Sequence, residues 1–192
     1  MPKISRSDIL VPAEGFRSRE VASFFAQLED QSRRLGEAVR GITPEEMEWQ
    51  PAPGMNTIGM LLAHLAIGET LWVQFALLDR TEFDVPAAIG VPIEHDGLPL
   101  ASGAAPPEHL RGTTVGQYED LLARARAYFR EAAVGLTDED LDRTITRDRD
   151  DGTRREFNLR WALYHMLEHF SGHFGQILLL RHQYAASRLP AR

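Results

Sequence analysis

The chain has 192 residues, of which 43% are hydrophobic and 26% are charged, a composition typical of one globular domain with a sizeable core. Its 21 Lys and Arg against 28 Asp and Glu give a net charge of −7, which argues against a nucleic-acid partner, because phosphate binding depends on clustered positive charge. The absence of Cys excludes disulfides, a catalytic Cys and thiolate metal sites, so any metal must be held by His and carboxylates.

The beginning of the chain predicts an N-terminal arm over residues 1–15, with Pro2 and Pro12 in it. This stretch lacks the apolar run of a signal peptide, and the sequence predicts no segment that is long and apolar enough to span a bilayer. We therefore expect a cytoplasmic protein with no membrane partner, folded as a single domain over residues 1–192.

Residues 17–40 are predicted to form the first helix, because apolar side chains such as Val21 and Leu35 recur there with helical spacing. A one-turn helix should follow, since Thr43 suits an N-cap and Pro44 suits the first helical position.

The second helix is predicted from residue 56 or 57 to residue 79. Its run IGMLLAHLAIGETLWVQFALL is apolar nearly all round, which places it at the centre of the fold. His64 is its only histidine, and Gly68, one turn later, leaves space beside it. A single histidine in such a helix is more often a hydrogen-bonded core residue than a metal ligand.

Residues 81–112 contain five prolines and four glycines, which predict a long crossover in place of a long helix. A crossover of this length can return the chain to its starting end, so the second and third helices would run parallel. His95 and His109 lie within this segment and are expected at the surface.

The third helix is predicted over residues 114–134, beginning with a capping box of Thr114 and Gln117. The stretch 135–142 that follows resembles residues 41–48 almost position for position. The chain therefore consists of two helix pairs related by a weak internal repeat, each ending in a helix that bears histidine.

Residues 143–157 alternate in character around Asp151 and Gly152, a pattern typical of a short hairpin. Asn158 is a suitable N-cap for the last helix, and Pro190 marks the outer limit of its end. Four long helices are thus expected, with the hairpin placed just before the fourth.

The last helix carries His165, His169 and His173 at intervals of four residues, which places them along one face. Three core histidines on one line are hard to account for, because each unpaired buried ring costs about 1–3 kcal/mol. Two imidazoles one turn apart can instead converge on one metal ion, with a further ligand from a neighbouring helix. His64 could supply that ligand.

The segments NTIGMLLAHLAIGE, GLTDEDLD and HMLEHFSGHFGQI resemble the DinB/YfiT-like superfamily of four-helix metalloproteins, and the resemblance covers most of the chain. It implies an all-α, up-down-down-up four-helix bundle, often a homodimer. It leaves His165 as a non-ligand and shows Phe174 where members often have a basic residue. It assigns the metal ligands to His64, His169 and His173.

Characterised members of that superfamily include transferases that join low-molecular-weight thiols such as bacillithiol to electrophiles, and a mycothiol-dependent isomerase. The resemblance implies one divalent ion held by three neutral imidazoles, with an open position at which a thiol or water becomes a nucleophile. Zinc or nickel is expected in purified protein, with manganese or iron as alternatives. The substrate is expected to be a small molecule, and the thiol must come from a cosubstrate because the chain has no Cys.

Three functions stay open: thiol transfer, hydrolysis by metal-bound water, and a non-catalytic, metal-stabilised binding or stress-response module. The catalytic candidates are Glu168 and His165. Glu168 adjoins a predicted ligand in sequence but lies about 100° round the helix, so a solvated carboxylate is the plainer interpretation. Gln176, Trp72 and Tyr164 are candidates for binding a cosubstrate, although aromatic residues at helical spacing more often belong to the core.

Overall fold

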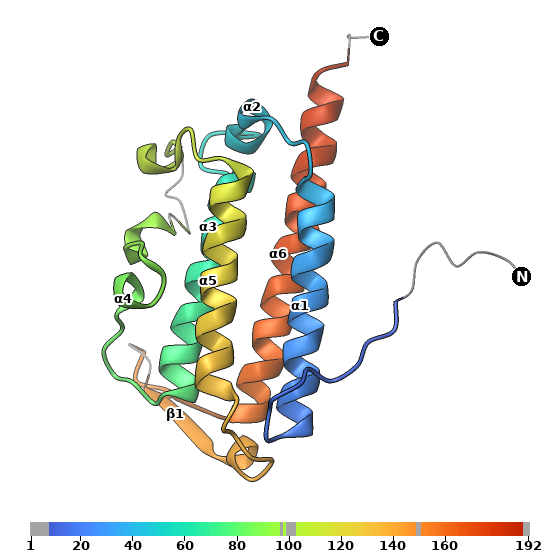
Figure 1. Ribbon diagram of the computed structural model, residues 1–192. Helices are drawn as coiled ribbons and strands as arrows, with labels where there is room; N and C mark the ends of the chain where they lie inside the picture. Colours follow the sequence, from blue (N-terminus) through green and yellow to red (C-terminus); the bar gives the residue numbers. More distant parts are fainter. Residues whose placement is uncertain (1–7, 97, 99–102, 149–150, 190–192) are drawn as a thin grey trace, which may run out of the picture.

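The computed structural model describes residues 8–96, 98, 103–148 and 151–189, and in these the chain is mostly helical with one two-stranded sheet. Four long helices lie side by side (Figure 1): α1 (Arg19–Val39), α3 (Ile58–Trp72), α5 (Val115–Ala133) and α6 (Leu159–Ser187). Both α1 and α3 contact α5 and α6, so the four helices surround one core. In Figure 1, α1 and α6 run toward the upper end, and α3 and α5 run the opposite way.

Side chains at the N-caps explain where these helices begin. The side chains of Ser18, Thr57 and Asn158 each accept a hydrogen bond from the backbone N–H three residues later. Thr114 and Gln117 form the predicted capping box of α5. The helix starts therefore agree with the sequence prediction to within one or two residues.

Helix α3 is buried on nearly all sides, as its sequence predicts. It continues into a π-helix, η1 (Val73–Leu77), and the chain turns at Asp79, a non-glycine residue with φ of 53°. The single α-helix predicted to residue 79 is therefore wrong in its last turn. The sequence carries no breaker there, so its pattern could not signal the change.

The segment Ile58–Leu77 is long and apolar enough to cross a membrane by length and composition alone, with a mean hydropathy of 1.4. By that measure the prediction that the chain contains no such stretch is wrong. The most apolar window of this segment is 78% buried inside the protein, which is the environment of a core helix.

The predicted hairpin is confirmed. Strands β1 (Thr144–Asp148) and β2 (Arg154–Asn158) pair antiparallel, with Ile145 opposite Phe157. Ile145 is buried, so this face of the hairpin packs against the lower end of the helices in Figure 1. The two repeat copies differ: the first forms a turn of α-helix, α2 (Pro44–Glu48), and the second only a 3-10 turn, η4 (Asp140–Asp142).

The crossover contains three short helices, α4 (Val85–Ile89), η2 (Ile93–His95) and η3 (Glu108–Leu110), and residues 97 and 99–102 lie outside the described residues. Helix α4 contacts α3 and α5, and η2 contacts α3. The crossover therefore lies along α3. Of the predicted N-terminal arm, residues 8–15 have no regular helix or strand; residues 1–7 and Pro190 lie outside the described residues.

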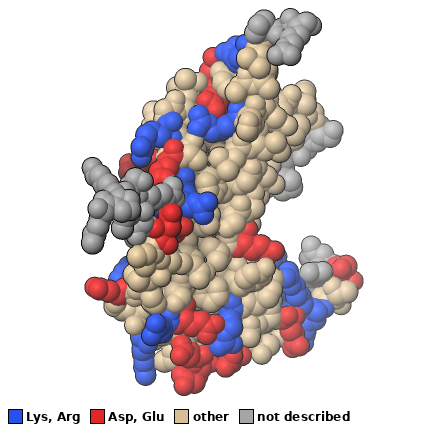
Figure 2. Space-filling view, turned by 90° about the vertical axis from the view of Figure 1, so that its right-hand side faces the viewer, with Lys and Arg blue, Asp and Glu red and all other residues tan. Residues whose placement is uncertain are grey.

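One side of the molecule carries a broad area without charged side chains, with charged groups gathered along one edge and at the lower end (Figure 2). Helix α6 contributes to this character, because no charged residue occurs between Glu168 and Arg181. Leu178 and Leu179 in that stretch are exposed.

Candidate metal centre

Three imidazoles meet where α3 and α6 pack together. His64 comes from α3, and His169 and His173 lie one turn apart on α6, so one nitrogen of each ring falls within 4.8 Å of the others. The ring centroids are 4.5 to 4.7 Å apart, and the Nε2 atoms of His64 and His169 are separated by 2.7 Å. The structure therefore brings together the three histidines that the sequence singles out.

The outer nitrogens of two of these rings have fixed partners. Asp96 Oδ1 lies 2.7 Å from His64 Nδ1, and a carboxylate only accepts, so Nδ1 carries the proton and the Nε2 lone pair of His64 faces His169. Gln176 Oε1 likewise accepts from His173 Nδ1 at 2.9 Å. In metal-binding histidines, one ring nitrogen usually donates a hydrogen bond to a fixed partner, and the other nitrogen offers its lone pair to the metal.

The charge state of the cluster also suits a cation. Burial, together with smaller contributions from the neighbouring His64, His173 and His165, lowers the pKa of His169 to about 3. Burial lowers the pKa of His173 as well. These imidazoles are neutral at physiological pH, the state in which their nitrogens can bind a metal.

The low pKa of His169 predicts a pH-dependent stability for the metal-free protein. The unfolded chain takes up a proton below pH 6.5 while folded His169 stays neutral down to about 3, so acid favours unfolding within this window. The free energy of unfolding should fall by up to about 1.4 kcal/mol per pH unit from this residue. Urea denaturation at pH 7 and pH 5 measures the effect. An equal loss in His169→Gln would contradict the assignment to His169.

Space for His169 comes from Gly68 on α3. A Cβ atom at position 68 would lie 3.1 Å from His169 Cε1, closer than ordinary van der Waals contact. The space that the sequence predicts beside His64 therefore serves the facing ring of His169. A larger residue at position 68 must displace that ring.

Gly68→Ala is expected to weaken metal affinity by about tenfold, because metal sites are sensitive to displacements of about 0.5 Å. Competition with a chromogenic chelator measures this affinity. Gly116→Ala is the matched control, since Gly116 is also helical and has open space around it. Equal affinities in the two variants would show that His169 does not depend on a glycine here.

His165 lies outside the cluster. Its ring packs between Trp72 and Trp161, with both centroids at 4.8 Å, and its centroid is 6.1 Å from that of His169. Glu168 lies 3.3 Å from His165 Nδ1, and its side chain is 56% exposed. The structure thus places the two catalytic candidates beside each other and directs the Glu168 carboxylate to His165.

The three candidates for cosubstrate binding have different surroundings. Trp72 borders a narrow crevice shared with His169, so it adjoins the cluster. Gln176 contacts the cluster through His173, as described above. Tyr164 is half exposed on α6, and among the described residues its ring does not pack against any of the three histidines.

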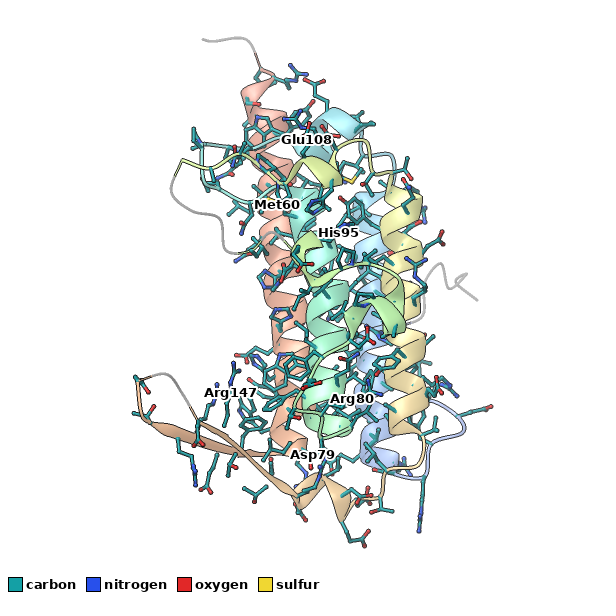
Figure 3. The ribbon with its side chains drawn as sticks, turned by 90° about the vertical axis from the view of Figure 1, so that its left-hand side faces the viewer. Met60, Asp79, Arg80, His95, Glu108 and Arg147 are labelled. Atoms are coloured by element: carbon teal, nitrogen blue, oxygen red, sulfur yellow. The ribbon has the colours of Figure 1, made fainter. Side chains whose placement is uncertain are left out.

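Asp96 is the member of the site that sequence reasoning missed. It lies in the irregular crossover, 32 residues from His64, where no periodicity indicates which way a side chain points. His95 beside it was expected at the surface, but it is half-buried and stacks on exposed His109 with centroids 4.1 Å apart. Figure 3 shows His95 where the crossover passes in front of α3.

A mostly helical fold with three convergent imidazoles between two of its long helices defines a candidate metalloprotein of the DinB-like type. The family model of the mycothiol-S-transferases matches residues 23–186, which include all three histidines and most of each long helix. The chain therefore belongs to the mycothiol-S-transferase family, within the DinB-like superfamily that its motifs resemble. No curated protein matches the chain.

Proposed function

We propose that this protein binds one divalent metal ion through His64, His169 and His173 and transfers mycothiol to an electrophile. The observation that carries the metal site is the convergence of three imidazoles with ligand nitrogens within 4.8 Å of one another. Membership of the mycothiol-S-transferase family supports the choice of thiol.

The residues present fit a divalent ion. Two imidazoles have their outer nitrogens anchored by Asp96 and Gln176, and the third is neutral and fitted against Gly68. All three are half-buried, and three protein ligands with an open position distinguish a catalytic zinc site from a structural one. A divalent ion held here would supply the positive charge that lowers the pKa of a thiol near neutral pH.

The other residues of the site orient the histidine rings and shield them from water. Asp96 fixes the tautomer and orientation of His64, and Gln176 does the same for His173. Trp72 lines the same narrow crevice as His169, so its apolar ring would limit the access of water from that side. The chain has no Cys, so the attacking sulfur belongs to the cosubstrate.

The position of Glu168 favours thiol transfer over hydrolysis. A hydrolase needs a base close to the attacking water, and the Glu168 carboxylate is turned to His165 and solvent. The half-buried state of the three histidines likewise supports an enzyme over a module in which the metal only stabilises the fold.

Turnover of monochlorobimane by metal-loaded protein tests the proposed reaction. The fluorescent conjugate should form with mycothiol, disappear when a chelator removes the metal, and return on adding zinc. Ester hydrolysis without thiol is the parallel assay. Hydrolysis that is independent of thiol, with no conjugate formed, would contradict thiol transfer and support the water-based reaction.

The remaining expectations are part of the same proposal. The helix directions in Figure 1 support the up-down-down-up four-helix bundle of the superfamily. The exposed Leu178 and Leu179 on the uncharged length of α6 support a homodimer. A cytoplasmic location and a small-molecule substrate stay predictions.

A further inference from the structure

A hollow of about 330 Å³ lies between α3, the crossover and the hairpin. Its walls are apolar and aromatic except for one arginine, and they are formed by Leu71, Trp72, Phe75, Phe83, Ile93 and Arg147. Trp72 also borders the crevice that contains His169. The hollow therefore shares one wall, Trp72, with the crevice that His169 lines.

The hairpin presents two arginines on the face that packs against the helices. Arg147 lies directly opposite Arg155 in the strand register, two residues beyond the Ile145–Phe157 pair, so the four side chains share one face. Like charges directly opposite each other destabilise a hairpin. Both arginines are exposed to solvent, which screens their repulsion, and the pair concentrates positive charge on this face of the hairpin.

Neither arginine forms an ion pair with any residue that the structure describes, although the hairpin carries acids. Asp148 and Glu156 lie on the opposite face, where Asp148 binds Arg154 at 2.7 Å. Asp148 thus has a partner on the outer face, while Arg147 and Arg155, both exposed to solvent, have no acidic partner among the described residues.

Each guanidinium group lies over an aromatic ring. The Arg147 guanidinium carbon lies 5.9 Å from the Phe75 ring centroid, and that of Arg155 lies 4.4 Å from Trp161. Figure 3 shows Arg147 between the hairpin and the lower end of α3. Stacking uses the face of a guanidinium and leaves its N–H edge free, which is the edge that binds a carboxylate or phosphate.

We propose that this hollow binds a small molecule with a planar apolar body and an oxyanion, a carboxylate or a phosphate. The apolar body would lie against Trp72, Phe75 and Phe83, and the oxyanion would bind Arg147 at the wall of the hollow, with Arg155, its neighbour in the strand register, as a second cation. The identification of this molecule as the electrophile rests on the proposed thiol transfer. The hollow then selects anionic aromatic electrophiles for the metal centre beside it.

Calorimetric titration of the full chain with three naphthalene probes tests this subsite. 2-Naphthoate and 2-naphthyl phosphate carry the oxyanion, and 2-naphthalenemethanol has the same rings without charge. At least one anion should bind about tenfold or more tightly than the alcohol, and the tighter anion identifies the oxyanion class. Titrations with and without zinc should give the same preference, which separates binding by arginine from coordination to the ion.

The variant Arg147→Gln with Arg155→Gln should reduce the preference for the anion to about twofold or less while the alcohol still binds. Arg154→Gln is the matched control, because it removes a charge from the outer face of the same strand, and it should keep the preference. Circular dichroism at the titration temperature verifies that each variant is folded.

The subsite would be overturned if none of the three probes bound, or if the anions and the alcohol bound equally well. It would also be overturned if Arg154→Gln lost the preference for the anion as fully as the double variant. This outcome is separable from the proposed reaction, since probe binding requires neither metal nor thiol. If the protein conjugates monochlorobimane but the naphthalene probes show no preference for the anion, only the subsite is rejected. Anion preference without any conjugation would reject only the thiol transfer.

Discussion

Alanine at His64, His169 or His173 is expected to reduce bound metal from one ion per chain to a trace after dialysis. Loss of a partner that only orients a ligand weakens metal affinity by about 10–100-fold, and loss of a ligand should weaken it further. Elemental analysis of zinc-loaded protein gives the stoichiometry directly.

His165→Ala is the matched control, because His165 lies on the same helix one turn earlier and packs between two tryptophan rings. It should keep one ion per chain. Full metal content in both His64→Ala and His169→Ala, or its loss in His165→Ala alone, would contradict the assignment of the ligands.

Glu69→Ala is expected to lower the free energy of unfolding by about 3–5 kcal/mol, because it leaves the Arg126 charge buried without its partner. Arg126 Nε and Nη2 lie 2.8 and 2.9 Å from the two oxygens of Glu69, and both residues are buried. Burial alone would lower the pKa of Arg126, but the carboxylates, Glu69 foremost, outweigh burial and hold that pKa above its usual value. Urea denaturation at pH 7 measures the loss.

Glu29→Ala is the control for Glu69. Glu29 reaches the same guanidinium at 3.4 Å, but its side chain is 53% exposed, so its removal should cost about 0–1 kcal/mol. Replacing Glu69 and Arg126 together with Met should recover most of the lost stability, because no charge is then left unpaired. A double variant as unstable as Glu69→Ala would show that the cost has another origin.

The helices could be predicted from the sequence because each carries strong local signals. Thr114 with Gln117 and the cap Asn158 mark helix starts, and the apolar run around His64 marks the buried helix. The meeting of His64, His169 and His173 followed from spacing on one helix and from family resemblance.

What the sequence could not predict depends on contacts between distant segments. Asp96 reaches His64 only because the crossover lies along α3. The π-helical turn after Trp72 has no local breaker to signal it. The arginine pair required the hairpin register, in which Arg147 falls opposite Arg155.

Titration of the cobalt-substituted protein with mycothiol tests the central claim most directly. A thiol sulfur entering the open position of the three-histidine site should produce a charge-transfer band that saturates at one thiol per cobalt. S-methylated mycothiol should produce no such band. A cobalt spectrum that stays unchanged as mycothiol is added to protein with full metal content would contradict the claim.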